Sequence, residues 1–257
     1  MKLLIDLGNS RLKVAVPAPG GRIRLLGEAR HREAGVEAAL ATALQGVGPQ
    51  DVTGVLCANV AGGAAGHALE EALQARGWGR PDFLRARPEA CGVRCAYAEP
   101  ARLGADRWAA LLGARSLTEG ACLVVDAGSA LTIDAMAPGG LHLGGWIIAG
   151  LGMMLEALES STGDLRALRL ASAGVPLADF PADSGPAMEG GVLLAAAGAV
   201  RVACERLEER SGVVARLLVT GGDARALLPA LAGAEHAPEL VLQGLARAAG
   251  GRQGGPC

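Results

Sequence analysis

Short apolar runs, glycine-rich turns and segments of helical periodicity follow one another along this chain. Residues 2–7 and 12–16 are apolar runs on either side of a turn at Gly8–Arg11, and they predict a β-hairpin. Further strands are predicted at 53–58, 122–126, 130–136 and 216–220. Helical spacing of apolar residues predicts helices at 34–45, 64–76, 152–160, 184–210 and 224–232, and a further helix that carries Trp108 and ends near Thr118. Residues 240–248 close the second lobe. This pattern is typical of an α/β protein.

The pattern begins twice. Residues 2–16 read KLLIDLGNSRLKVAV, and residues 122–136 read CLVVDAGSALTIDAM. In each, a strand reaches an Asp, continues to a Gly and a small hydroxyl residue, and resumes as a second strand. We interpret the chain as a duplicated α/β unit with lobes at 1–117 and 118–249. The segment 250–257 has nothing to bury and is expected to be disordered.

Composition excludes several classes of protein. Apolar residues make up 51% of the 257 residues and charged residues 19%, which is a globular balance, and with only 2% aromatic residues the core must be aliphatic. The net charge of −2 comes from interspersed charges, so a nucleic-acid partner is not expected. The longest uncharged apolar stretch, 135–155, is broken by Pro138, several Gly and His142, which favours turn, strand and loop over a membrane span. The amino terminus lacks a signal-peptide pattern, so we expect a cytoplasmic protein.

The cysteines and histidines do not form a recognisable metal motif. The six Cys are interpreted mainly as small buried hydrophobes, and the spacing of Cys91 and Cys95 is weak evidence for zinc because no second pair completes it. The four His are scattered along the chain. No nucleophile–histidine pair is predicted.

The repeated turn is suited to binding phosphate. A strand that ends in Asp and runs into Gly lets a ligand approach backbone N–H groups while the carboxylate holds a cation. A single Asp-x-Gly is more often a plain turn. Two such turns, at equivalent points of two lobes, would face each other across a cleft and hold a polyphosphate. Gly221 and Gly222 follow a third strand and leave room for a flat group such as adenine. Neither of the two commonest nucleotide-binding loops occurs.

Three segments together resemble the phosphate and adenosine motifs of the acetate/sugar kinase, Hsp70 and actin superfamily. They are 6–13, 126–130 and 220–224. Within that superfamily, Tyr97 and the segment Leu103–Trp108 are similar to the substrate motif of type III pantothenate kinases, which phosphorylate pantothenate with ATP in the first step of coenzyme A synthesis. Further matches are Gly144, Gly145, Gly150, Thr162–Leu165, Ala187–Gly190 and Leu242–Leu245. The resemblance implies two ribonuclease H-like lobes with an interlobe cleft.

The resemblance also implies a set of nucleotide-binding residues. The ATP phosphates would be held by the first turn, made of Asp6, Leu7, Gly8, Asn9, Ser10, Arg11, Leu12 and Lys13. Asp6 would place Mg²⁺ and Lys13 would compensate charge. In the second turn Asp126 would bind a monovalent cation, K⁺ or NH₄⁺, and Ser129 would meet the nucleotide phosphates. Gly221 and Gly222 would contact the adenosine.

The implied acceptor site is built around Asp106. Asp106 would be the general base, although an N-cap of the helix carrying Trp108 is the structural alternative. Arg107 would meet the pantothenate carboxylate, unless it is an ordinary surface Arg, and Tyr97 would line the same pocket or only pack at its rim. Gly104 and Ala105 belong to the same motif. Ser184 stands where a Thr of the family touches the substrate across a dimer interface.

Several departures and alternatives remain open. Ser10 and Ser129 replace the usual Thr of both phosphate turns, Asp183-Ser184 replaces Asn-Thr, and Leu165 lacks the usual following Pro. A homodimer is expected, with the low-charge helix at 187–204 as interface, although that helix could equally face its own core. The alternative function is a non-catalytic nucleotide-binding regulator of the Bvg accessory factor type, which would be expected to lose Asp106. An actin-like or chaperone ATPase would need larger insertions than this chain has.

Overall fold

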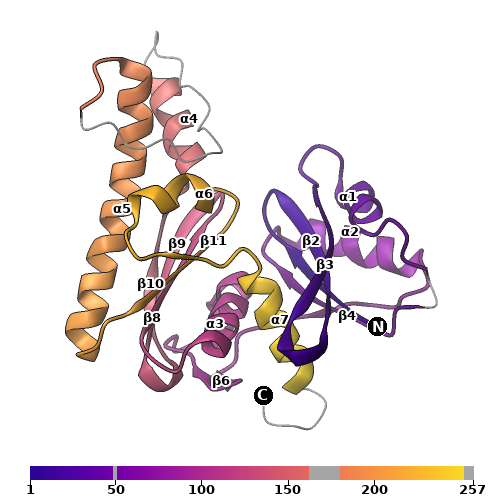
Figure 1. Cartoon of the computed structure of the whole chain (residues 1–257). Coiled ribbons are helices and arrows are strands. Elements are labelled where there is room, and N and C mark those ends of the chain that lie inside the picture. Colours follow the sequence, from indigo (N-terminus) through magenta and orange to yellow (C-terminus); the bar gives the residue numbers. More distant parts are fainter. Residues whose placement is uncertain (49–50, 162–179, 252–257) are drawn as a thin grey trace. The chain divides into compact units, whose positions relative to one another are not determined.

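The computed structural model describes residues 1–48, 51–161 and 180–251. The chain separates into two compact units. One is formed by Met1–Leu117 together with the C-terminal segment from Glu239, and the other by Thr118–Pro238. Each unit is a β-sheet with helices packed against it (Figure 1), so the prediction of an α/β chain is confirmed. The family-like segment Thr162–Leu165 and the residues 252–257 lie outside the described ranges.

The first unit contains a five-stranded sheet in the order β3-β2-β1-β4-β5. Its strands are β1 (Lys2–Leu7), β2 (Arg11–Pro17), β3 (Ile23–Arg30), β4 (Gly54–Asn59) and β5 (Asp82–Phe83), and its helices are α1 (Val36–Ala43), α2 (Gly63–Gln74), α3 (Ala105–Leu117) and α7 (Leu240–Gly251). The pairs β1–β2 and β2–β3 are antiparallel, whereas β1–β4 and β4–β5 are parallel. A short antiparallel hairpin of β6 (Glu89–Ala90) and β7 (Val93–Arg94) precedes α3.

The second unit repeats this arrangement. Its strands β8 (Cys122–Ala127), β9 (Ala130–Ala137), β10 (Leu141–Ala149), β11 (Arg216–Thr220) and β12 (Glu235–His236) follow the order β10-β9-β8-β11-β12, and its helices are α4 (Leu151–Ser161), α5 (Ser184–Ser211) and α6 (Ala224–Leu227). The pairs β8–β9 and β9–β10 are antiparallel, and β8–β11 and β11–β12 are parallel. Strand order and direction are therefore the same in both units, as the duplicated sequence pattern predicts.

The duplication also includes a turn that sequence analysis did not detect. Pro19–Gly21 links β2 to β3, and Pro138–Gly140 links β9 to β10. Both Gly of the first turn (φ 73° and 71°) and both Gly of the second (φ 74° and 82°) adopt the left-handed conformation that glycine tolerates best. The same Pro-Gly-Gly therefore makes the same connection in both units.

Alternation along β1 separates the core from the candidate site. Leu3, Ile5 and Leu7 are fully buried in a cluster that α1 and α2 complete with Val36, Leu40, Leu69 and Leu73. Since neighbouring side chains of a strand point to opposite faces, Asp6 lies on the other face of the sheet. The strand that builds the core thus also presents the carboxylate.

Helix α7 belongs to the first unit, not to the second lobe in which sequence analysis placed residues 240–248. It packs against α3 through two glycines: a Cβ on Gly113 would lie 2.3 Å from the carbonyl oxygen of Leu240, and one on Gly244 would lie 1.7 Å from that of Ala109. This backbone contact between residues far apart in sequence leaves no periodic signal. Helix α7 also includes Gly250 and Gly251, so the prediction of a disordered tail from residue 250 is wrong for these two residues.

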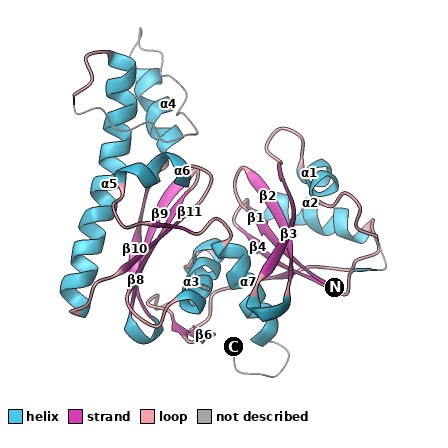
Figure 2. Cartoon of the chain, in the orientation of Figure 1, coloured by secondary structure: helices cyan, strands magenta, loops and turns pink. Residues whose placement is uncertain are grey.

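The apolar stretch 135–155 forms the end of β9, the Pro-Gly-Gly turn, β10 and the start of α4 (Figure 2). Among the described residues, one helix is long and apolar enough to cross a membrane, namely α5, with a mean hydropathy of 1.5 over its best window. Only 28% of that window is buried within the chain. Length and composition of a single helix are weak evidence for a membrane span.

Candidate active site

The first turn joins β1 to β2 directly after Asp6. The backbone N–H of Gly8 donates to the carbonyl oxygen of Arg11 at 3.1 Å and closes the turn. The strand register places Lys13 opposite Asp6. The eight residues predicted to hold the ATP phosphates therefore form one strand end, its turn and the start of the next strand.

Asp6 is an electrostatically unusual carboxylate. Desolvation by burial raises its pKa from the ordinary value of 3.8 to about 6, Lys13 lowers the pKa, and the charge of Asp106 raises it. Asp106 is 100 residues further along the chain, yet it lies close enough to act on Asp6. The structure thus brings together the two carboxylates to which the sequence assigned separate roles.

Asp106 lies in the first turn of α3, as predicted, but it is not the N-cap. The helix begins at Ala105, and the carbonyl of Gly104 accepts the first helical bond, from Trp108 at 2.9 Å. Asp106 Oδ1 accepts from the backbone N–H of Arg107 at 2.7 Å. A Cβ on Gly104 would lie 2.7 Å from the same oxygen, so glycine leaves the space that the carboxylate occupies.

Arg107 is buried, with 7% of its surface exposed, so the alternative of a solvated surface Arg is wrong. Its guanidinium donates to the hydroxyl of Tyr97 at 3.2 Å and lies 6.0 Å from the centre of the Tyr97 ring. A cation that is fixed on an aromatic hydroxyl is suited to receive a carboxylate. The structure therefore brings Tyr97 and Arg107 together, as the substrate motif implies.

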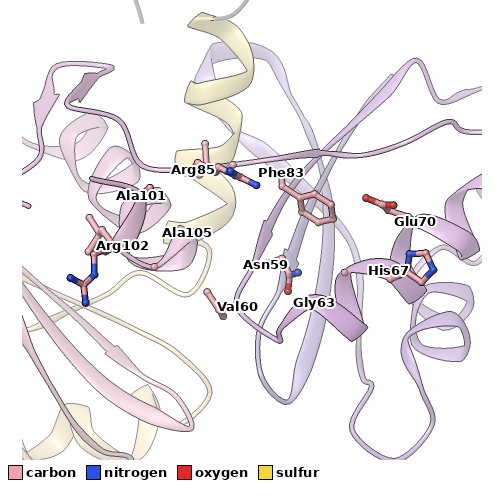
Figure 3. Close-up of a pocket in the computed structure, with 14 residues that line it drawn as sticks. Asn59, Val60, Gly63, His67, Glu70, Phe83, Arg85, Ala101, Arg102 and Ala105 are labelled. Carbon is pink, nitrogen blue, oxygen red and sulfur yellow. The ribbon is translucent and has the colours of Figure 1, made fainter. Parts of the chain in front are cut away.

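A pocket of about 590 Å³ adjoins this motif within the first unit (Figure 3). One wall comes from the end of β4 and from α2, with Asn59 and His67, and the opposite wall runs from Ala101 to Ala105. Gly104 and Ala105 therefore face this pocket. Tyr97 lines a smaller pocket of about 310 Å³, and Arg102 lines both.

The second turn joins β8 to β9 after Asp126. The N–H of Gly128 donates to the carbonyl of Ala130 at 3.2 Å. Gly150, at the start of α4, packs on this turn: its N–H donates to the carbonyl of Ser129 at 3.3 Å, and a Cβ on it would lie 2.3 Å from the carbonyl oxygen of Gly128. The predicted residues Asp126 and Ser129 thus belong to one closely packed turn of the second unit.

Gly221 requires glycine for a reason other than the predicted one. Its φ is 97°, and a Cβ on it would lie 2.4 Å from both the Ala127 carbonyl oxygen and Asp126 Oδ1. The missing side chain therefore makes room for the second turn itself, not only for a flat ligand. Gly222 follows Gly221 in the connection from β11 to α6.

The structure also places Ser184 and the cysteines. Ser184 is the exposed first residue of α5, and the preceding Asp183 is its N-cap, accepting from the N–H of Gly185 at 3.3 Å. Cys91 is disulfide-bonded, whereas Cys57, Cys95 and Cys204 are free thiols, so the interpretation as simple buried thiols fails for Cys91. Among the described residues no cluster of three or more His, Cys, Asp or Glu could hold a metal.

Comparison with known proteins identifies the family. The model of the type III pantothenate kinase family matches residues 2–206. The chain is 38% identical to a type III pantothenate kinase of Nitrosococcus oceani over 256 residues, which cover 97% of this chain and 94% of the relative. The chain belongs to the type III pantothenate kinase family. A second member, from Halorhodospira halophila, is 38% identical over 95% of this chain and 96% of its own.

Solved structures support the fold of this family member. A Campylobacter jejuni protein described as a Baf family transcriptional activator aligns over 98% of both chains with a TM-score of 0.57 and 23% identity. A 2-dehydro-3-deoxygalactonokinase structure from Sinorhizobium meliloti aligns over 99% of this chain and 100% of its own, with a TM-score of 0.57 and 15% identity. At such identities the likeness concerns the fold, and it agrees with two ribonuclease H-like lobes.

Sequence analysis missed one residue at the first turn. His31, counted there among scattered histidines, lies just after β3, and its ring nitrogen Nε2 is 2.7 Å from the carbonyl oxygen of Gly8. No motif marks this residue. The contact follows from the β2–β3 pairing, and the polar pattern of β3 gave no strand prediction.

Proposed function

We propose that this chain transfers the γ-phosphoryl group of ATP to the hydroxyl of pantothenate and forms 4′-phosphopantothenate, the first step of coenzyme A synthesis. Membership of the type III pantothenate kinase family supports this activity. The residue roles given below are our proposals. They are based on the family motif and on the contacts within each unit.

One observation carries the proposal: Asp106 is close enough to Asp6 to raise its pKa. Asp6 lies near the end of β1, beside a turn that is suited to phosphates and a cation. Asp106 lies in the first turn of α3, within the substrate motif. Phosphoryl transfer needs the acceptor hydroxyl and the terminal phosphate in line, so the groups that handle them must be neighbours.

In the proposed site the first turn binds the ATP phosphates. Backbone N–H groups from Gly8 to Arg11 donate to phosphate oxygens, and Lys13 offsets their charge. Gly8 leaves the turn free of a side chain: a Cβ there would meet only the Arg11 carbonyl, at 3.5 Å. The room therefore serves a ligand, since the protein itself does not fill it.

The chemistry of Asp6 fits magnesium. Mg²⁺ keeps several waters and takes one or two carboxylates together with substrate phosphates, so a three-residue metal cluster is not required. Burial, which is the largest cause, and the charge of Asp106 both raise the pKa of Asp6, and a divalent cation beside the carboxylate would favour its ionised form. When bound, the cation would neutralise charge on the transferred phosphate.

Asp126 and Ser129 are proposed to act on the same nucleotide. Asp126 would hold a K⁺ or NH₄⁺ ion, which accepts hard oxygen ligands, and Ser129 would donate its hydroxyl to a phosphate. Gly221 and Gly222 would contact the adenosine. The support for these roles is the family motif together with the packed turn that contains Asp126, Ser129 and Gly221.

Asp106 is the proposed general base. It would accept the proton of the pantothenate hydroxyl as the new phosphorus–oxygen bond forms, and it would orient that hydroxyl beforehand. Arg107, held by Tyr97, would bind the pantothenate carboxylate, and the backbone of Gly104 and Ala105 would line the site. Ser184 would reach the substrate of a partner subunit in a homodimer.

The activity is tested by ADP release with and without pantothenate, in the presence and absence of K⁺, for the wild type and Asp106→Asn. We expect pantothenate-dependent release and a kcat that falls about 10³-fold in the variant, because a positioned base contributes this order of magnitude. The control Asp82→Asn, at an exposed Asp of the same unit, should keep its kcat. ADP release that ignores pantothenate would exclude the kinase, and an active Asp106→Asn would exclude the base.

Oligomeric state is tested separately. Light scattering should give a dimer, and a fully active monomer would contradict the role of Ser184 in a partner's site. A cytoplasmic location without nucleic-acid or membrane partners remains part of the proposal. The alternative of a non-catalytic regulator is not favoured, since Asp106 is present and lies beside Asp6.

A further inference from the structure

His31 is fixed to the first turn at two points. It is the first residue after β3, and its backbone N–H donates to the carbonyl oxygen of Ser10 at 3.2 Å. Its ring nitrogen Nε2 lies 2.7 Å from the carbonyl oxygen of Gly8. A carbonyl oxygen only accepts, so Nε2 carries the proton and donates. With 8% of its surface exposed, His31 makes this bond largely away from water.

The two bonds determine the direction of the peptide groups in the turn. In a trans peptide the N–H points opposite to the C=O of the same plane, and the described chain contains no cis bond. Since the carbonyls of Gly8 and Ser10 point to His31, the N–H groups of Asn9 and Arg11 point away from it. Two backbone donors are thus aimed at the side of the turn that is opposite to the histidine.

The side chain adds something that strand pairing does not supply. β2 pairs with β3 up to Arg11 and Arg30, and the His31 N–H continues that ladder by one step. Gly8 lies on the other arm of the turn, next to β1, and β2 separates β1 from β3 in the sheet. The ring of His31 reaches the Gly8 carbonyl, so the imidazole links both arms of the turn.

We propose that His31 is a positioning residue for the nucleotide triphosphate: it holds the Gly8 peptide so that the N–H groups of Asn9 and Arg11 meet phosphate oxygens. This inference rests on the proposed function, in which the first turn binds the ATP phosphates. Preorganised donors bind an anion better than donors that must first be ordered. His31 itself touches neither phosphate nor pantothenate.

The test compares His31→Phe, which keeps a ring but loses the donor, with His31→Gln, whose amide nitrogen can take the place of Nε2. We expect His31→Phe to raise KM for ATP about tenfold, the usual effect of losing one buried hydrogen bond. KM for pantothenate should stay unchanged, and His31→Gln should restore much of the ATP affinity. The matched control is His236→Phe, at an exposed His on β12, which should keep the wild-type KM for ATP.

The outcomes separate this inference from the proposed function. If Asp6→Asn abolishes activity but His31→Phe keeps the wild-type KM for ATP, the inference on His31 is wrong and the kinase assignment stands. If the wild type does not bind ATP, the proposed function is wrong, and the inference on His31 is wrong with it. Equal rises in both KM values, without rescue by Gln, would show a merely structural role. Should His31→Phe not fold, His31→Asn takes its place, because its shorter amide cannot reach the Gly8 carbonyl.

Discussion

The two phosphate-type turns have the same plan but differ in length and in the residue that faces the carboxylate. In the first, Leu7 pairs with Leu12, so residues 8–11 form the connection, whereas in the second Ala127 pairs with Leu131 and only residues 128–130 remain. Lys13 lies opposite Asp6, whereas Thr132 lies opposite Asp126. The first turn thus has a cation in register with its carboxylate, and the second has a neutral hydroxyl there.

The turns also differ in what holds them from outside. A histidine side chain holds the first turn through the Gly8 carbonyl. The second is held by backbone: Gly150 and Gly221 approach it so closely that neither has space for a Cβ, and the N–H of Asp223 donates to the Ala127 carbonyl at 2.8 Å. The duplicated motif therefore keeps its strand–turn–strand plan, while the turn length and the residues that support the turn differ between the two units.

The largest expected effect separates the two carboxylates. Asp6→Asn should lower kcat about 10³-fold at any K⁺ concentration, because it removes the proposed magnesium ligand. Asp126→Asn should lower kcat about tenfold in saturating K⁺ and should abolish the response to K⁺. Steady-state assays over a K⁺ series, at fixed Mg²⁺, measure both.

Equal losses in the two variants, or a K⁺ response that survives Asp126→Asn, would contradict the division of roles between the turns. Asp82→Asn serves as the control, because it removes an exposed carboxylate of the first unit that we place outside the site.

The next effect concerns stability. Gly150→Ala should destabilise the protein by about 3 kcal/mol, since its Cβ would overlap two backbone carbonyls that have little room to move. Gly8→Ala should leave the free energy of unfolding nearly unchanged but weaken ATP binding, because its Cβ would meet protein atoms only at ordinary distance. Urea unfolding monitored by circular dichroism, together with nucleotide titration, checks both expectations.

Gly152→Ala is the matched control for the second turn, because no atom lies within 4 Å of a Cβ placed there. If Gly150→Ala is as stable as Gly152→Ala, the second turn is not held by close backbone packing.

A smaller effect is expected from the pH dependence of stability. The folded pKa of Asp6 is about 6, above its ordinary value of 3.8, so the native state binds this proton more tightly than the unfolded state. Ionisation of Asp6 therefore opposes folding: its contribution to stability is highest below pH 3.8, falls between about pH 4 and 6, and stays low above that. Asp6→Asn should be more stable than the wild type at pH 8 by about 3 kcal/mol, when divalent metal is chelated.

Urea unfolding of the wild type and of Asp6→Asn is measured at pH 4 and at pH 8, and the difference in their free energies of unfolding is compared between the two pH values. The contributions of the other carboxylates cancel in this difference. A difference that does not depend on pH would mean that burial in the folded state does not raise the pKa of Asp6.

Most elements of the fold could be predicted from the sequence because their signals are local. Apolar runs marked β1, β4, β8 and β11, and the repeated Asp-to-Gly pattern indicated the duplication that the strand orders confirm. Two features of the fold could not be predicted from the sequence, for physical reasons. β3 is partly exposed, so its sequence alternates too weakly, and α7 joins the first unit through glycine contacts with α3 that carry no periodicity.

The candidate site could be predicted only as separate pieces. Asp6 and Asp106 were each recognised from their own motif, but their proximity depends on tertiary packing that no spacing reveals. Gly221 was noted for the correct property, its missing side chain, yet the atoms that use this space belong to the turn after Asp126. His31 has no motif at all, since its role depends on a strand pairing and one ring nitrogen.

The smallest effect concerns the two serines that replace the family's threonines. Thr carries a methyl group that restricts its χ1 rotamer, so Ser10→Thr and Ser129→Thr should each improve ATP affinity by about twofold if their hydroxyls meet phosphate oxygens. The first turn is the longer one and is held by a side chain, so it can adjust to the added methyl. In the second turn the Gly150 N–H donates to the Ser129 carbonyl at 3.3 Å, and Gly150 approaches that carbonyl too closely to carry a Cβ, so the backbone of this turn has less freedom to adjust. We therefore expect Ser10→Thr to gain affinity without loss of stability and Ser129→Thr to lose a few tenths of a kcal/mol in folding, as measured by nucleotide titration and urea unfolding. The reverse order would mean that the second turn, despite its close packing, is the more adaptable of the two.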